Sequence, residues 1–192
     1  MEILIITGPP YSGKGTQCYI IKSQLGFEHI STGDRIRLEK NQKTQIGKIM
    51  SEYEEQGNLV PDSIMKELLW KIMEENQNKP GIILDGYPRT SAQVDTLNTL
   101  LTEKKQNVLK VINIYVPKEE LIVRAKKRAE TSDRKDDKDQ QIHFKRIELF
   151  ESETRPAIEY MKSLFHVTTI DGLGTIEGIT NKIKTEIANA QS

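Results

Sequence analysis

Residues 2–17 read EILIITGPPYSGKGTQ, and this stretch decides the fold class. A short apolar run ends at Gly8, a loop of small residues carries Lys14, and a helical pattern begins directly after it. This is the strand–loop–helix order that a phosphate-binding loop requires, because inward-turned backbone N–H groups, the positive end of the helix and the lysine all attract phosphate oxygens. In this context the stretch favours a phosphate loop over a glycine-rich turn with a chance lysine.

Four further apolar runs alternate with helical patterns along the chain. They span residues 27–30, 81–85, 108–116 and 166–170. Strands that alternate with helices indicate βαβ units and a parallel sheet covered on both faces. We therefore predict an α/β fold, a three-layer sandwich with a five-stranded parallel sheet. Between residues 64 and 73 the apolar residues recur at helical spacing, which predicts an amphipathic helix behind the start signal Pro61-Asp62.

The composition excludes several classes of function. Lys plus Arg and Asp plus Glu both number 28, so the net charge is zero, and only 6% of the residues are aromatic. Neither a nucleic-acid-binding surface nor a membrane-binding surface is expected from these values. The single cysteine, Cys18, excludes an internal disulfide and a cysteine-rich zinc site, and we expect it in the core.

The same sequence gives expectations for location, assembly and domain organisation. No apolar run reaches transmembrane length and the amino terminus lacks a basic region, so we expect a cytoplasmic protein. No heptad pattern is visible, so we expect a monomer. We expect one domain over residues 1–192, with a helical insert at 31–73 and a short lid at 128–141. Residues 130–141 contain no apolar residue and are expected to be solvated.

Several motifs carry a resemblance to a known family. The segment GKGTQ at 13–17 resembles the nucleoside monophosphate kinases, above all the adenylate kinases, and STGD at 31–34, DGYPR at 85–89 and the arginines between 124 and 146 follow in the family's order. The resemblance covers nearly the whole chain. It implies a P-loop kinase of the short-lid form, without zinc, whose helical insert binds the nucleoside monophosphate. It also implies reversible, Mg²⁺-dependent phosphoryl transfer from ATP to AMP, giving two ADP.

By this resemblance the site residues fall into three groups. ATP is bound by Tyr11, Ser12, Gly13, Lys14, Gly15, Thr16, Arg124, Arg128 and Gly174. AMP is bound by Thr32, Arg37, Asn58, Leu59, Val60, Gly86, Arg89, Gln93, Arg134 and Arg146. The catalytic cations are Lys14, Arg89, Arg124, Arg128, Arg134 and Arg146, and Asp85 holds Mg²⁺ through water.

From the residues alone, plainer interpretations stand beside these roles. Ser31 and Asp34 have the spacing of a helix capping box. The arginines between 124 and 146 fit a solvated helix face, and residues 171–174 fit a simple β-turn equally well. The three histidines form no ligand cluster in the sequence, so we interpret them as structural.

Two positions depart from the family's pattern. The family usually has glycine where this chain has Tyr11, and a positive φ there would strain tyrosine by roughly 1–2 kcal/mol. Either the loop differs locally or nucleotide binding is weakened. The spacing from Asp137 to Arg146 is one residue longer than in many relatives, which leaves Lys145 as an alternative.

Three residues, Thr32, Thr90 and Gln93, predict that the acceptor base is adenine. Pyrimidine-directed relatives tend to have other residues at the first two positions, and the amide of Gln93 can pair with adenine. Two alternatives remain from the sequence. One is a UMP/CMP kinase of the same fold, and the other is a non-catalytic nucleotide sensor, which only Tyr11 favours.

Overall fold

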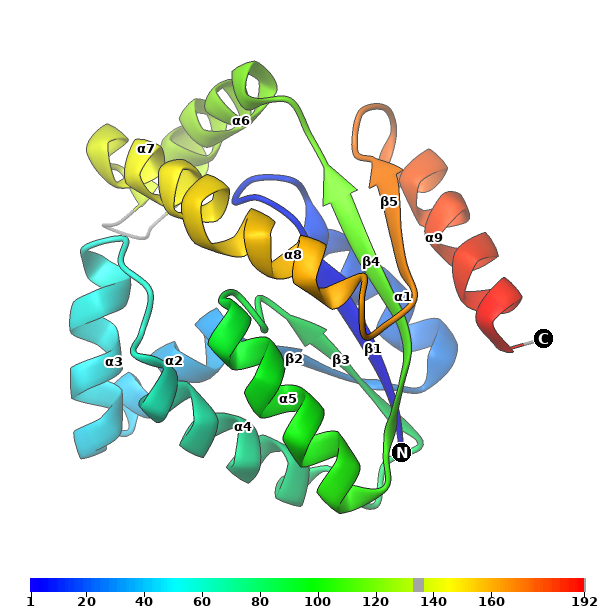
Figure 1. Cartoon of the computed structure of the whole chain (residues 1–192). Coiled ribbons are helices and arrows are strands. Elements are labelled where there is room, and N and C mark those ends of the chain that lie inside the picture. Colours follow the sequence, from blue (N-terminus) through cyan, green and yellow to red (C-terminus); the bar gives the residue numbers. More distant parts are fainter. Residues whose placement is uncertain (133–136, 192) are drawn as a thin grey trace.

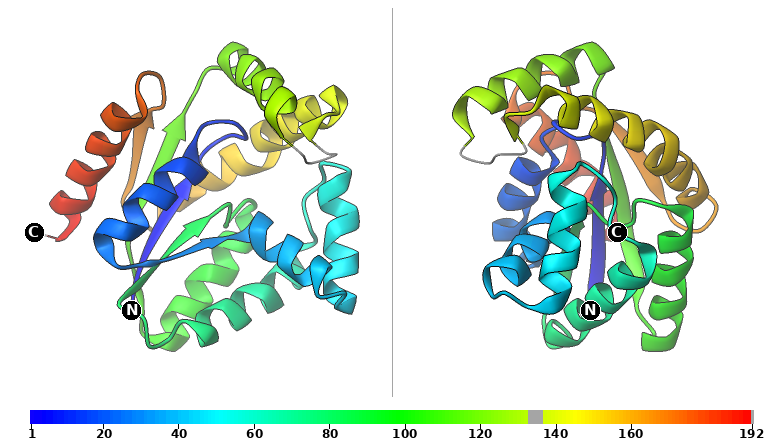
Figure 2. Two further views of the ribbon diagram at one scale, coloured as in Figure 1. Left: turned by 180° about the vertical axis from the view of Figure 1, so that it is seen from behind. Right: turned by 90° about the vertical axis from the view of Figure 1, so that its left-hand side faces the viewer.

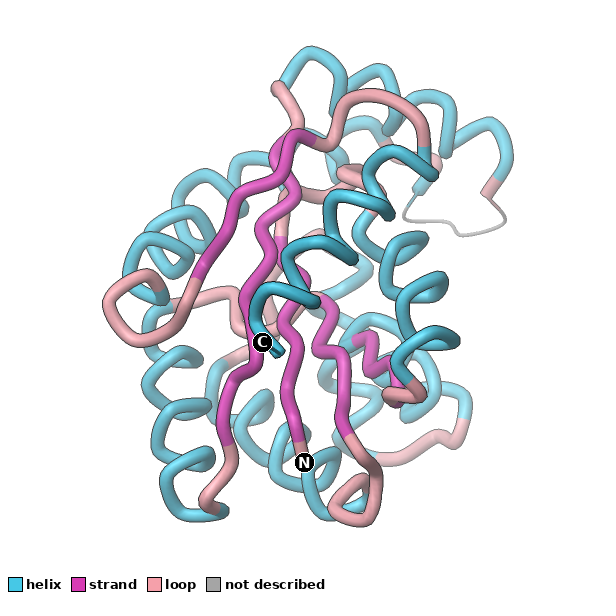
Figure 3. The backbone as a smooth tube through the Cα atoms, turned by 90° about the vertical axis from the view of Figure 1, so that its right-hand side faces the viewer, coloured by secondary structure: helices cyan, strands magenta, loops and turns pink. Residues whose placement is uncertain are grey.

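The computed structural model describes residues 1–132 and 137–191. Its centre is one sheet in which every neighbouring pair of strands is parallel, in the order β2-β3-β1-β4-β5. The strands are β1 (Glu2–Thr7), β2 (Glu28–Ser31), β3 (Gly81–Asp85), β4 (Asn107–Tyr115) and β5 (Val167–Asp171). Each coincides with a predicted strand, shifted by at most one residue, and Figure 3 shows them side by side.

Helices cover both faces of this sheet (Figures 1 and 2). One face is covered by α1 (Lys14–Leu25) and α9 (Ile176–Gln191). The other is covered by α4 (Asp62–Glu75), α5 (Ser91–Lys104) and α8 (Arg155–Met161). The other helices within the described residues are α2 (Thr32–Asn41), α3 (Gln45–Glu55), α6 (Lys118–Thr131), α7 (Gln140–Leu149) and the π-helix η2 (Phe150–Thr154). The predicted three-layer α/β sandwich is confirmed.

The continuous apolar run of β1 follows from this layering. Ile3 and Ile5 are fully buried beneath α4 and α5, whereas Leu4 and Ile6 are fully buried beneath α1 and α9. A central parallel strand has no solvated face, so its apolar residues do not alternate with polar ones. The carboxyl end of β1 therefore delivers the following loop to the edge of a rigid, dry layer.

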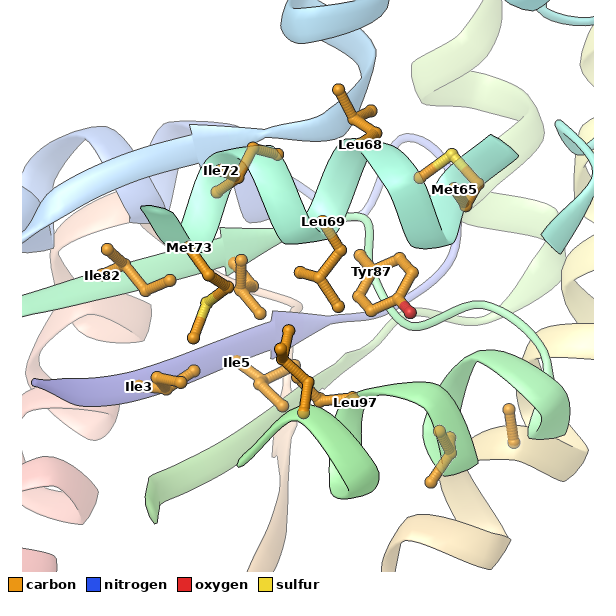
Figure 4. Close-up of a cluster of buried hydrophobic side chains, with 14 of the residues drawn as sticks. Ile3, Ile5, Met65, Leu68, Leu69, Ile72, Met73, Ile82, Tyr87 and Leu97 are labelled. Carbon is orange, nitrogen blue, oxygen red and sulfur yellow. The ribbon is translucent and has the colours of Figure 1, made fainter. Parts of the chain in front are cut away.

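The helical stripe predicted between residues 64 and 73 is α4. Figure 4 shows Leu69 and Met73 of this helix pointing toward side chains of β1, β3 and α5. By contrast, α2 and α3 pack on one another at the side of the molecule (Figure 1). Of the expected insert at 31–73, α4 thus belongs to the layer on the sheet, and α2 and α3 project from it.

The second projecting part consists of α6 and α7, which lie beyond the carboxyl ends of the strands, and α7 continues through η2 into α8 (Figure 1). The expectation of a fully solvated stretch at 130–141 is wrong at Asp137, which has no exposed surface. Arg128 and Arg146 both contact its carboxylate, and this pairing permits its burial. In the described part of the chain, no helix combines the length and apolar character needed to cross a membrane.

Candidate active site

The loop between β1 and α1 has the geometry of a phosphate cradle. Gly8 has φ 144°, and a Cβ there would lie 2.5 Å from the carbonyl oxygen of Ile114, so only glycine fits. Gly13, with φ 90°, precedes the first turn of α1. Lys14 folds back over the loop, and its Nζ donates to the carbonyl oxygen of Pro9 at 3.3 Å. Burial lowers the pKa of Lys14, while Asp85 opposes the change.

Tyr11 adopts the strained conformation that its position predicted. Its φ is 69°, in the left-handed region, at a cost of about 1–2 kcal/mol. The ring is partly buried against a small apolar cluster that includes Leu121 and Ile147. Its hydroxyl hydrogen-bonds to Nδ1 of His143 on α7. The tyrosine thus makes contacts that a glycine would lack.

Asp85 ends β3 beside the phosphate loop. It is 7% exposed, and its Oδ2 lies 3.2 Å from Nε2 of His29. A Cβ on Gly15 would lie 3.6 Å from the same oxygen, so the loop and the carboxylate adjoin. The hydroxyl of Ser12 is buried and has no hydrogen-bond partner among the described residues. A carboxylate and an unpaired hydroxyl near a phosphate cradle fit a hydrated Mg²⁺ ion carried by a nucleotide.

A sulfur and a nitrogen atom lie close to the same carboxylate. Ligand atoms of Cys18, His29 and Asp85 lie within 4.8 Å of one another, so the interpretation of His29 as purely structural is incomplete. Burial raises the pKa of the Cys18 thiol, and Asp85 raises it further. The thiol therefore stays protonated at neutral pH, whereas metal sites use the thiolate. Mg²⁺ prefers oxygen ligands, so Asp85 is the member of this group that suits it.

A second cradle joins β2 to the loop after β3. The Thr32 hydroxyl donates to the carbonyl oxygen of Gly86 at 3.1 Å, and Nε of Arg89 donates to the same oxygen at 2.6 Å. Gly86 has φ 81°, and a Cβ there would lie 2.7 Å from the Arg89 guanidinium. Burial lowers the pKa of Arg89, while Asp85 opposes the change, so the guanidinium stays charged at neutral pH. This arrangement points a rigid cation into the cleft.

The amide of Gln93 is held at both ends. Its Oε1 accepts from the backbone N–H of Arg89 at 2.8 Å, and its Nε2 donates to Oδ1 of Asp62 at 2.7 Å. The same Asp62 oxygen accepts from the Thr90 hydroxyl at 3.1 Å. Gln93 is 2% exposed. The amide therefore has a fixed orientation, with one N–H and one lone pair left over.

Arg37 on α2 is held by acidic neighbours. Its guanidinium pairs with Glu54 at 2.5 Å and with Asp34, whose backbone N–H also donates to the Ser31 hydroxyl. The capping interpretation of Ser31 and Asp34 is thus correct at the start of this helix, and it leaves Arg37 facing the cleft.

The second projecting part, α6 with α7, contributes two arginines, Arg128 and Arg146, that bind one carboxylate, and we call these the lid arginines. Nε of Arg128 donates to Asp137 Oδ2 at 2.8 Å, and Arg146 donates to Oδ1 at 3.4 Å. Arg146 also donates to the carbonyl oxygen of Glu54 at 3.3 Å, which links α7 to the end of α3. Arg146, not Lys145, is thus the lid residue that lines the cleft. Arg134 lies outside the described residues.

Arg124 has a different environment. It pairs with Glu120 at 2.8 Å, and its guanidinium donates to the carbonyl oxygens of Ser12 at 3.4 Å and Gly172 at 3.0 Å. It therefore braces the phosphate loop against the turn after β5, where Gly174 is exposed with φ 108°.

These elements enclose a cleft of about 480 Å³. The predicted site residues that line it are Tyr11, Lys14, Gly15, Arg37, Asn58, Leu59, Asp85, Gly86, Arg89, Arg128 and Arg146. An adjoining pocket of about 40 Å³ is lined by Thr32, Val60 and Gln93 together with Asn58, Leu59 and Arg89. The remaining predicted residues within the described chain lie outside both: Ser12, Gly13, Thr16, Arg124 and Gly174.

Comparison with known proteins agrees with this geometry. A family model described as adenylate kinase matches residues 6–165. The chain belongs to the adenylate kinase family. It is 40% identical to an adenylate kinase of Bacteroides thetaiotaomicron over 92% of this chain and 93% of the relative. It is 37% identical to an adenylate kinase of Leifsonia xyli over 96% of this chain and 92% of the relative. It is 36% identical to one of Thermus thermophilus over 95% of each chain.

The structure adds three residues to the candidate site of this adenylate kinase family member that the sequence did not reveal. Asp62 was interpreted as part of a helix start and was not assigned a role in the site, yet it orients Gln93. Glu54 holds both Arg37 and Arg146. His143 was interpreted as structural, yet it contacts Tyr11 of the phosphate loop. All three residues were found through contacts between segments that are distant in sequence, and the spacing of motifs does not reveal such contacts.

Proposed function

We propose that this protein catalyses the reversible transfer of the γ-phosphoryl group of ATP to AMP, giving two ADP. One observation carries the proposal. Lys14 of the phosphate loop, Arg89 of the acceptor cradle and the two lid arginines line a single cleft, although they come from four distant parts of the sequence. Phosphoryl transfer needs such a set, because charge spreads over the equatorial oxygens of the transferring group.

The donor side is the phosphate loop. Its backbone N–H groups and the start of α1 surround the β- and γ-phosphates, and Lys14 adds a charge that its partly buried position strengthens. Ser12, Gly13, Gly15 and Thr16 supply the rest of this loop. Arg124, which donates to the carbonyl oxygen of Ser12, acts with Arg128 on the donor phosphates, and Gly174 lies against the donor base. Bound Mg²⁺ supplies charge neutralisation on the phosphates, and Asp85 is the residue that would hold it through water.

The acceptor side is the cradle between α2, α3 and the loop after β3. Arg37 and Arg89 bind the α-phosphate of AMP, with Arg89 as the rigid cation and Arg37 released from its acidic partners. The adenine enters the pocket beside Leu59 and Val60, where the free N–H and lone pair of Gln93 meet its edge.

Catalysis in this cleft is positioning and electrostatic stabilisation. The phosphate loop and the acceptor cradle hold the two nucleotides in line, and Arg128, Arg134 and Arg146 stabilise the charge of the transferring group. Closure of α2–α3 and of the lid at 128–141 excludes water, which would otherwise hydrolyse ATP. We place both moving parts in one domain that spans residues 1–192.

The finer properties of the protein follow the same proposal. We expect it to work as a monomer in the cytoplasm, without zinc and without nucleic-acid partners. The zero net charge and the single cysteine support the last two expectations.

A turnover assay with purified protein, Mg²⁺-ATP and a panel of AMP, UMP, CMP and GMP tests the proposal. We expect ADP formation with AMP at a kcat/KM on the order of 10²-fold or more above the pyrimidine nucleotides. Equal or better turnover of UMP or CMP would replace the assignment with a pyrimidine monophosphate kinase. ATP binding without turnover of any monophosphate would replace it with a nucleotide sensor.

A further inference from the structure

Tyr11 joins two parts of the active site that are 132 residues apart in sequence. Its ring meets that of His143 edge to face, with centroids 5.1 Å apart and an interplanar angle of 68°. Burial raises the pKa of the Tyr11 hydroxyl, and the nearby Arg146 opposes this only in part, so the hydroxyl keeps its proton at neutral pH. The phosphate loop is therefore hydrogen-bonded directly to a helix of the lid.

The contact continues beyond His143. Its Nε2 lies 2.7 Å from the backbone carbonyl oxygen of Asp137, which can only accept a hydrogen bond, so Nε2 carries the hydrogen. In the neutral ring Nδ1 then accepts from the Tyr11 hydroxyl. The Asp137 carboxylate in turn accepts from Arg128 at 2.8 Å and from Arg146 at 3.4 Å. A continuous set of hydrogen bonds thus runs from the phosphate loop to both lid arginines.

These hydrogen bonds lie in a buried environment, and the backbone of Tyr11 points its side chain toward them. His143 is 4% exposed and Asp137 is fully buried, so water does not compete for these hydrogen bonds. The left-handed φ of 69° aims the Tyr11 side chain at α7, and Ile147 of that helix packs beside the ring. A glycine, which this φ favours, would offer neither ring nor hydroxyl.

We propose that Tyr11 and His143 are positioning residues that fix the lid arginines relative to the phosphate loop. This inference rests on the proposed phosphoryl transfer, because it assigns the arginines to the transferring group. Tyr11 then contributes to the function of the site, and its departure from glycine does not merely weaken the phosphate loop. Its removal acts on the lid arginines and leaves the acceptor pocket, which Gln93 and Leu59 line, unchanged.

Conservative variants separate this role from a general structural one. Tyr11→Phe keeps the ring and removes the hydroxyl. His143→Gln keeps a donor near the Asp137 carbonyl and removes the acceptor that Tyr11 uses. Tyr160→Phe is the matched control, because Tyr160 on α8 also loses one hydrogen bond, to Asp95 at 2.7 Å, outside the cleft.

We expect Tyr11→Phe and His143→Gln each to lower kcat by about 3- to 10-fold, the value of one hydrogen bond. The KM for AMP should change by less than about twofold, because the acceptor pocket is untouched. The double variant should be no slower than the slower single variant, since both changes break the same connection. Tyr160→Phe should keep wild-type kcat.

A second readout does not depend on turnover. In the nucleotide-free protein, the backbone amides of α7 should exchange hydrogen faster in Tyr11→Phe than in the wild type, while those of α4 exchange equally. Wild-type kcat and exchange rates in both single variants would overturn the inference and leave the proposed function standing. Losses of kcat that multiply in the double variant would also overturn it. Faster exchange in α7 together with an inactive wild type would support the connection and refute the proposed function instead.

Discussion

The fixed amide of Gln93 makes the choice of acceptor base depend on Asp62. Nε2 of Gln93 donates to Asp62 at 2.7 Å and its Oε1 accepts from Arg89 at 2.8 Å, so the amide cannot reverse without losing both bonds. One N–H and one lone pair remain for the base, and adenine offers an acceptor and a donor in that order. Uracil presents a donor and an acceptor in the reverse order and leaves this arrangement incomplete, whereas cytosine shares the order of adenine and differs by its smaller, single ring.

The size of the preference for AMP in kcat/KM follows from the number of polar groups that another base leaves unpaired. Two buried polar groups that lose their partners cost about 1–3 kcal/mol each, or about 2–6 kcal/mol together, which spans roughly 30-fold to 10⁴-fold in kcat/KM. We expect the wild type to prefer AMP over UMP by on the order of 10³-fold, and over CMP, which pairs with the amide but fills the pocket less well, by on the order of 10²-fold. Asp62→Ala removes one of the two hydrogen bonds that hold the amide, which lowers the cost of reversing it, and the preference for AMP over UMP should fall about 10-fold. Gln93→Ala should reduce it further and lower the maximal rate with AMP by less than about threefold.

Initial rates of ADP formation at saturating Mg²⁺-ATP, with AMP, UMP and CMP varied in turn, give kcat/KM for each acceptor and hence the preference for AMP in each variant. Asp95→Ala is the matched control, because this residue on α5 loses a hydrogen bond from Tyr160 away from the cleft. Melting temperatures of all variants show whether each protein is folded. An unchanged preference in Asp62→Ala, or an equal loss in Asp95→Ala, would refute the reasoning.

The remaining predictions concern the phosphate cations, the core, the acid stability and the metal. Lys14→Ala and Arg89→Ala should each lower kcat/KM by roughly 10³-fold or more with an unchanged circular dichroism spectrum, and near-normal turnover in either would contradict their placement. Leu69→Ala should lower the free energy of unfolding by about 2–5 kcal/mol in urea titration, because this side chain is 2% exposed beneath the sheet, and a loss under about 1 kcal/mol would contradict that packing. The hydrogen bond from Lys110 lowers the pKa of Glu186 below 4.5, and because solvent screens this partly exposed carboxylate, Glu186→Gln should cost about 0.5–1 kcal/mol at neutral pH. That deficit should shrink as the pH falls below 4.5 through the lowered folded-state pKa, and a deficit independent of pH would contradict the linkage. Chelation with EDTA should abolish turnover and Mg²⁺ should restore it, while elemental analysis should find no stoichiometric zinc.

The parts of the fold that the sequence predicted are those set by local pattern. Five apolar runs became five strands because each is short, continuous and followed by a turn or helix signal. The phosphate loop was visible because its glycines and lysine are adjacent in sequence. The strain at Tyr11 was also predictable, because the φ of one loop position depends on local geometry.

The parts that the sequence did not predict depend on distant contacts. Nothing near Tyr11 or His143 shows that the two residues meet. The burial of Asp137 within a run of charged residues follows only from the convergence of two arginines on it. The amphipathic stripe of α4 was visible, yet its partner was not, so the helix was grouped with the insert and not with the sheet layer.

One cleft that binds two adenine nucleotides should move a phosphoryl group between them in either direction. The most direct test is to incubate the purified protein with Mg²⁺ and ADP alone and to measure the products by ion-exchange chromatography. We expect ADP to be converted into ATP and AMP in equal amounts until equilibrium, and Lys14→Ala to do this at least about 10³-fold more slowly. Unchanged ADP, or AMP and inorganic phosphate without ATP, would show that the cleft does not carry out this transfer.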